Sequence, residues 1–227
     1  MRNEDEHKKR ATRLRPFTSD SELCSVQRQE IVRKWDSKHG FHSVMVDGSH
    51  LPFEENVALT KRIVDIAHGR GITVEAELGR LSGSEDGLTV YEYEAKLTDV
   101  EQAKRFATET GVDALAVCVG NVHGKYPTSG PKLDLSRLKA LHMAFAKSGP
   151  ALVMHGASGL PPPVIQECIS LGITKFNVNT ELREAYMQAV SNPQRELINA
   201  MDMAVAAMEA VVAQKLAMFR SVGKSCH

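Results

Sequence analysis

Two histidines stand directly after apolar segments, and each is followed by glycine. His123 lies in GNVHGKYP and His155 lies in MHGASG. Neighbouring strand ends can bring two imidazoles to one tetrahedral Zn²⁺, and the glycines let a ligand come close to the backbone. A single histidine in such a place is more often a hydrogen-bonded structural residue, so it is the pairing of the two that favours a metal site.

Two short segments rich in small and hydroxyl-bearing residues follow the last two apolar runs. GASG begins at Gly156, and NVNT ends at Thr180. Each segment opens a predicted helix, and exposed amides at helix N-termini bind phosphate. The alternative, that Thr180 is an ordinary N-cap and GASG a tight turn, stays open for either segment alone.

Several acids lie near the same predicted edge. Glu75 and Glu77 are two residues apart, so a strand directs both to one face, and Asp47 ends the preceding apolar run. One inward carboxylate is a candidate metal ligand or a support for the ligands, with a buried salt bridge as the alternative. Glu85 lies in LSGSEDGLT, which is typical of a mobile lid that carries an acid.

The elements that must position these side chains are repeated βα units. Short apolar runs alternate with stretches of helical period, which indicates a parallel sheet covered by helices. The expected strands span 42–47, 72–78, 114–120, 151–156 and 174–179. Asp99 is expected to cap a helix that stops at Gly111, and a long final helix is expected over about 193–219.

Polar clusters follow these strands one after another, as in the carboxyl-end loops of a TIM (β/α)8 barrel. Closing eight strands at this spacing would need about 90 more residues. We therefore expect an α/β fold of the TIM-barrel type, incomplete with five of eight parallel strands, plus a long C-terminal helix. Residues 1–40 are expected to form a divergent, partly disordered polar tail and helix, and residues 41–227 the barrel domain.

Five segments occur in this order: VMVDGSHLPFEEN, VEAELGRLSGSEDG, VGNVHGKYP, LVMHGASG and FNVNTELR. Over about residues 41–220 they resemble the class II, zinc-dependent ketose-bisphosphate aldolases, which include fructose- and tagatose-bisphosphate aldolases. The resemblance implies a lyase of carbohydrate metabolism with Zn²⁺ as cofactor. Its implied reaction is aldol cleavage or condensation of a ketose bisphosphate, yielding dihydroxyacetone phosphate and an aldehyde.

The resemblance also implies site residues. His123 and His155 match zinc ligands, Asp47 and Glu77 match positions for a displaced or second metal, and Glu85 matches a lid acid assigned to proton transfer. The positions that match those holding dihydroxyacetone phosphate are Gly124, Gly156, Ala157, Ser158, Asn177, Asn179 and Thr180. Other members carry Asp or Ala where Asn179 stands, so the sugar stays open.

One part of the family pattern is missing. Members carry an H-x-D-H-like motif about eighteen residues before the segment SVMVD, and it supplies the general acid/base Asp and the third zinc ligand. The corresponding stretch here reads ELCSVQRQE. We therefore expect an aldolase impaired by this loss, with a non-catalytic phosphosugar-binding remnant or an interaction subunit as alternatives.

The amino-acid composition limits the classes of binding partner that we expect. The chain has 227 residues with 28 basic and 28 acidic side chains, and this zero net charge provides no general field for a polyanion such as nucleic acid. We expect no membrane span, because no uninterrupted apolar stretch reaches roughly 18 to 20 residues. The four cysteines fit neither a zinc motif nor a disulfide framework, which favours the cytoplasm. A homo-oligomer, most simply a dimer, is expected because an open sheet leaves an unpaired edge.

Overall fold

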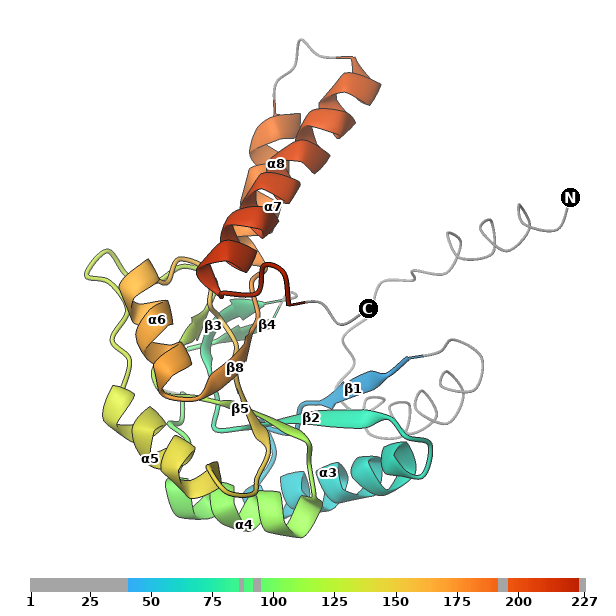
Figure 1. Ribbon diagram of the computed structural model, residues 1–227, viewed down its shortest axis with the longest axis vertical. Coiled ribbons are helices and arrows are strands. Elements are labelled where there is room, and N and C mark those ends of the chain that lie inside the picture. The colour runs from blue at the N-terminus through green and yellow to red at the C-terminus, as the bar shows by residue number, and fades with distance from the viewer. Residues whose placement is uncertain (1–40, 86–87, 92–94, 192–195, 225–227) are drawn as a thin grey trace, which may run out of the picture. The chain divides into compact units, whose positions relative to one another are not determined.

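The structure, a computed structural model, describes residues 41–85, 88–91, 95–191 and 196–224 (Figure 1). The tail and helix expected within residues 1–40 lie outside the described residues. The main sheet has five strands in the order β1-β2-β5-β7-β8. Their bounds are β1 Ser43–Val46, β2 Thr73–Leu78, β5 Ala114–Val117, β7 Ala151–Met154 and β8 Ile173–Phe176.

All neighbouring strands of this sheet are parallel, and sequence neighbours among them are also neighbours in space. Ser43 pairs with Thr73 between β1 and β2, and Glu77 pairs with Ala116 between β2 and β5. The β7–β8 pairing contains one register shift, between Leu152 and Val153. The five expected strands, their order and their parallel direction are thus confirmed, and the fold is an α/β arrangement consistent with part of a (β/α)8 barrel.

Helices cover one face of this sheet and bury its apolar residues (Figure 1). They are α3 Phe53–His68, α4 Val100–Thr110, α5 Leu135–Phe145 and α6 Pro162–Ser170. Ile63, Phe106, Leu138 and Ile165 point inward from these four helices and are at most 1% exposed. Their packing removes apolar surface from water, which is the main force that holds such layers together.

The start and end of α4 follow the sequence signals. The Asp99 carboxylate accepts a hydrogen bond from Gln102 N at 2.8 Å, as an N-cap does. Gly111 closes the helix in the left-handed conformation with φ 70°.

A second, three-stranded sheet lies beside the main one. Its order is β4-β3-β6, formed by Leu88–Val90, Ser82–Glu85 and Val122–His123. The segment LSGSEDGLT, expected to be a loop, thus contains β3 and the start of β4, because β3 and β4 pair antiparallel and β3 also pairs with β6. Its role as a mobile lid stays a prediction. Gly83 permits the second pairing, since a Cβ there would lie 2.0 Å from the His123 carbonyl oxygen. The alternation of small polar residues in this segment hid the strand pattern.

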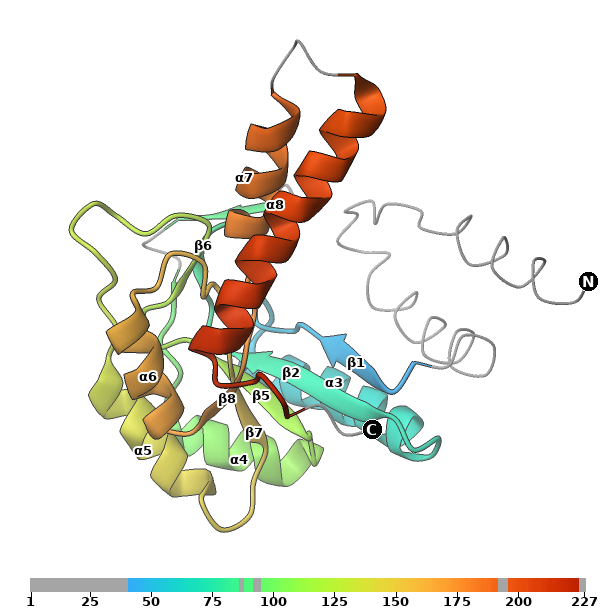
Figure 2. The ribbon, with the colours of Figure 1, turned by 45° about the horizontal axis from the view of Figure 1, so that its top comes forward.

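The chain ends in a hairpin of two helices, α7 Thr180–Val190 and α8 Leu197–Met218, which lie side by side in both views (Figures 1 and 2). Phe219 stacks on Phe176 with ring centroids 4.7 Å apart. By length and composition alone, α8 is apolar enough to cross a membrane, with a hydropathy of 1.3 over its best window. Asp202, Glu209 and Lys215 interrupt the apolar run of α8, so the expectation of no membrane span stays a prediction.

Candidate active site

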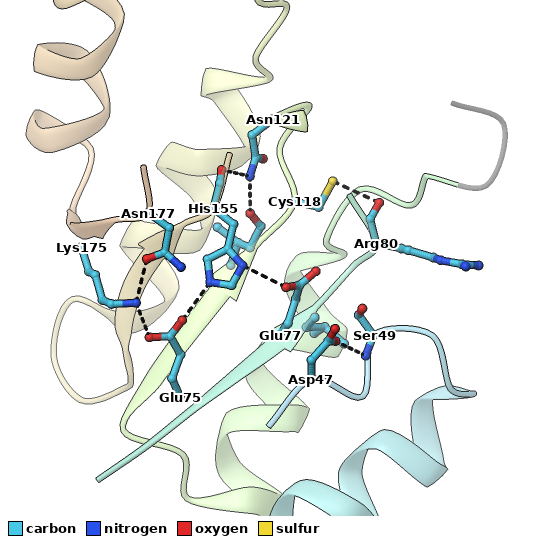
Figure 3. A network of polar contacts seen from close by, with 12 residues as sticks. Asp47, Ser49, Glu75, Glu77, Arg80, Cys118, Asn121, His155, Lys175 and Asn177 are labelled. Carbon is cyan, nitrogen blue, oxygen red and sulfur yellow. Dashed lines mark hydrogen bonds and ion pairs between the residues drawn. The ribbon is translucent and has the colours of Figure 1, made fainter. Parts of the chain in front are cut away.

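The polar side chains singled out by the sequence gather at the carboxyl ends of the strands (Figure 3). Glu75 and Glu77 lie on β2, His123 ends β6, and His155 directly follows β7. Parallel strands bring their carboxyl ends to one edge, so residues far apart in sequence meet there. His155 lies at the centre of the contacts drawn in Figure 3.

Both ring nitrogens of His155 contact carboxylates. Nε2 lies 2.9 Å from Glu75 Oε1, and Nδ1 lies 3.1 Å from Glu77 Oε2. The side chains of all three residues are between 5% and 7% exposed. The two carboxylates expected on one face of a strand therefore hold one buried imidazole between them, which is the salt-bridge arrangement weighed from the sequence.

This burial and pairing shift the pKa values of all three groups. Burial lowers the pKa of His155, but the hydrogen bonds with Glu75 and Glu77 outweigh it and raise that pKa to about 9. The pKa of Glu77 is raised by burial more than His155 lowers it. Burial also pushes up the pKa of Glu75, but His155 and Lys175 together bring it below its ordinary value. Imidazolium and the Glu75 carboxylate are thus the charged forms favoured near neutral pH.

His123 and His155 face each other with ring centroids 6.1 Å apart. Imidazole nitrogen and carboxylate oxygen are donors that zinc accepts, so the residue types suit the metal. Among the described residues, however, no group of three or more His, Cys, Asp or Glu side chains is placed so that it could hold a metal ion. Both nitrogens of His155 also already contact carboxylates. The site thus matches zinc in the kind of its donors and not in their number.

Two neighbours hold the histidine-bearing loops together. Asn121, which is 1% exposed, donates from Nδ2 to the His155 carbonyl oxygen at 2.9 Å. The Tyr126 hydroxyl donates to the Gly156 carbonyl oxygen at 2.9 Å, and burial raises the pKa of Tyr126 to about 12. Gly156 lets the loops approach, because a Cβ there would lie 2.0 Å from the Val122 carbonyl oxygen.

A cleft of about 380 Å³ opens beside His123. It is lined by His123, Gly124, Gly156, Ser158, Phe176, Asn177, Val178, Asn179 and Thr180. Ser158 Oγ accepts a hydrogen bond from Asn179 N at 3.2 Å, and Thr180 begins α7. Amides at a helix N-terminus favour an anion such as a phosphate group.

Six residues expected to hold the triose phosphate thus lie around one cleft, together with His123. They are Gly124, Gly156, Ser158, Asn177, Asn179 and Thr180. Ala157 is fully buried and does not line the cleft; its amide instead donates to the Asn177 carbonyl oxygen at 3.0 Å. Asp47 accepts from Ser49 N at 2.9 Å, and its charge helps to raise the pKa of Glu77. Glu85 is the last residue of β3.

Sequence reasoning assigned no site role to Lys175, Asn121 or Tyr126. In the structure Lys175 Nζ contacts the Glu75 carboxylate at 2.8 Å, across a separation of 100 residues. Lys175 and Asn177 are two residues apart, and in extended chain this spacing directs both side chains to the same face.

The fold is an α/β arrangement whose polar residues gather at the carboxyl ends of parallel strands, and comparison with known proteins identifies the family. The chain matches the family "Fructose-bisphosphate aldolase class-II" over residues 25–224. It therefore belongs to the class II fructose-bisphosphate aldolase family. The matched range begins before residue 41, within the segment that the structure does not describe.

Solved structures of aldolases are similar to the chain. A protein assigned as a fructose-1,6-bisphosphate aldolase from Coccidioides immitis is 36% identical, with a TM-score of 0.79, covering 86% of this chain and 69% of that one. The YdjI aldolase from Escherichia coli K12 is 37% identical, with a TM-score of 0.70, covering 87% of this chain and 66% of that one. The fructose-bisphosphate aldolase of Campylobacter jejuni, at 21% identity and a TM-score of 0.70, supports the fold alone. The chain spans about two thirds of the length of these proteins.

Proposed function

We propose that the chain binds the dihydroxyacetone phosphate part of a ketose bisphosphate and carries out aldol cleavage or condensation of fructose- or tagatose-bisphosphate type, with zinc as cofactor. The observation that carries this proposal is the cleft that joins His123 to the small residues and amides of Gly156, Ser158 and Thr180. Family membership supports the reaction class.

The residues of the chain have different proposed roles according to where they lie. The amides at the start of α7 and the loop at Gly156 and Ser158 hold the phosphate group, since both line the cleft. Glu75 and Glu77 fix the ring of His155 from both sides. Glu85, at the end of β3, is the proposed proton-transfer acid. His123 and His155 are the imidazoles that would hold zinc, and the metal would supply polarisation of a carbonyl and stabilisation of negative charge on oxygen.

We further propose that cleavage by this chain is slow. Residues 1–227 contain no H-x-D-H sequence, so the chain offers no counterpart of the family's acid/base Asp and third histidine ligand. Loss of a general acid/base group costs about 10²- to 10⁴-fold in rate. A steady-state assay of fructose and tagatose bisphosphate cleavage with added Zn²⁺ is expected to give turnover at least about 10²-fold below that of a family member with the motif. Ordinary turnover would contradict the proposed impairment.

A non-catalytic phosphosugar-binding protein is the second candidate. It is favoured because no group of three or more His, Cys, Asp or Glu side chains in the described part of the chain is placed to hold a metal ion. Binding of dihydroxyacetone phosphate with no cleavage of either bisphosphate would select this function.

We also propose that two copies of the chain associate through α8. Ile198, Met201, Val205 and Val212 are between 43% and 73% exposed, and their spacing of three, four and seven residues forms one seam. Apolar seams of this spacing pack against a second helix. A lipid bilayer is a less favourable partner for this seam than a second helix, because Asp202 beside the seam is costly to bury in lipid.

A charge placed on the seam is expected to dissociate this dimer. Val205→Glu would bury a carboxylate against the partner helix, so light scattering should report a monomer at concentrations where the parent chain is a dimer. Gln214→Glu adds the same charge at an exposed position on the opposite side of α8 and serves as the control. A parent chain that is monomeric, or a variant that stays dimeric, would contradict an interface at α8.

A further inference from the structure

One ammonium group links the buried carboxylate network to the lining of the cleft. Lys175 Nζ donates to Glu75 Oε2 at 2.8 Å and to Asn177 Oδ1 at 2.8 Å (Figure 3). Lys175 lies on β8, and Asn177 directly follows that strand. Glu75 lies on β2, three strands away from β8 in the sheet. The side chain therefore reaches across the strand ends to the carboxylate that contacts His155.

The Lys175 contact determines which way the Asn177 carboxamide faces. An ammonium group only donates hydrogen bonds, so the atom of Asn177 that meets it must be the amide oxygen. The amide NH₂ is then directed away from Lys175. Because Asn177 lines the cleft, this NH₂ is the group available to donate to a bound ligand.

We propose that Lys175 is a positioning residue that presents the Asn177 NH₂ as a donor to an oxygen of the dihydroxyacetone moiety. The inference rests on the function proposed above. Without Lys175 the carboxamide can turn over and offer an acceptor, which would repel an electron-rich substrate oxygen. The same ammonium contacts Glu75, which in turn contacts His155.

Lys175→Met, measured in the full chain, tests the inference. The substitution keeps most of the side-chain length and removes the donors, so affinity for dihydroxyacetone phosphate is expected to fall about 10-fold. Lys175→Arg retains donors and is expected to restore most of that loss. Affinity for inorganic phosphate is expected to change less than about 2-fold, since the phosphate-holding residues do not contact Lys175. Lys139→Met, on the exposed side of α5, is the matched control.

A double-mutant cycle separates positioning from general stabilisation. If Lys175 acts through Asn177, adding Lys175→Met to Asn177→Ala is expected to cause no further loss of affinity. Should Lys175→Met unfold, judged by its thermal melt, Lys175→Gln takes its place in the cycle. Equal affinity of the parent and Lys175→Met for dihydroxyacetone phosphate, or an additive double mutant, would overturn this inference and leave the proposed function standing. A parent chain that binds no dihydroxyacetone phosphate would overturn both.

Discussion

Gly156→Ala is expected to separate the two histidine-bearing loops and to destabilise the fold. The new Cβ would lie 2.0 Å from the Val122 carbonyl oxygen, and the residue has φ 65°. A side chain in the left-handed region costs about 1–2 kcal/mol, and forcing packed atoms apart costs about 1–3 kcal/mol more. The free energy of unfolding should therefore fall by about 2–5 kcal/mol in urea denaturation.

The same loop provides a matched control. Gly159 also has a positive φ, 78°, but a Cβ there would meet its nearest neighbour, Tyr126 Cδ2, at 3.8 Å. Gly159→Ala should therefore incur only the backbone cost of about 1–2 kcal/mol. Affinity for dihydroxyacetone phosphate should fall much further in Gly156→Ala than in Gly159→Ala. Equal losses of stability in the two variants would show that close approach to Val122 is not what Gly156 provides.

His155→Ala is expected to be the most damaging single change in the polar network. Removing the imidazole leaves the buried Glu77 carboxylate without the ring that faces it at 3.1 Å. Breaking a buried pair by deleting one partner costs about 3–5 kcal/mol, a large share of the roughly 5–15 kcal/mol that stabilises a typical domain. Urea denaturation followed by circular dichroism measures this loss directly.

Two comparisons isolate the cause. His123→Ala removes the other imidazole, which is only half-buried, and should cost much less stability. In a Glu77→Gln background a neutral amide replaces the carboxylate, so His155→Ala should cost less stability than it does in the parent chain. If the two backgrounds give the same loss, the contact between His155 and Glu77 does not stabilise the fold.

Much of the fold was predictable because its signal is local. The run ALAVCVG is apolar on both faces, as a strand covered by helices should be, and Leu115 and Val117 are fully buried in β5. The capping of α4 by Asp99 likewise depends on a few adjacent residues. The strand β3 was missed because its pairing with β6 depends on Gly83 and the distant His123 carbonyl group, and not on an apolar pattern.

The site, like the fold, could be predicted from the sequence only in part. Glycines and hydroxyl residues that follow strands indicated the cleft, since their positions in the sequence fix them at one edge. The contact between Lys175 and Glu75 could not be predicted, because it joins strands that are not neighbours and depends on side-chain reach. The pairing of both His155 nitrogens with carboxylates is likewise a property of the folded chain.

Exchange of hydrogen for deuterium at the hydroxymethyl carbon of dihydroxyacetone phosphate tests the proposed function most directly. The reaction needs the triose phosphate alone, so it does not depend on the acid/base Asp required for cleavage of the bisphosphate. Proton NMR of the triose phosphate in D₂O, with the full chain and added Zn²⁺, should show stereospecific loss of one hydrogen that saturates with substrate. The loss should disappear in His155→Gln. Saturable binding of dihydroxyacetone phosphate without exchange above the buffer rate would contradict aldolase chemistry at this cleft.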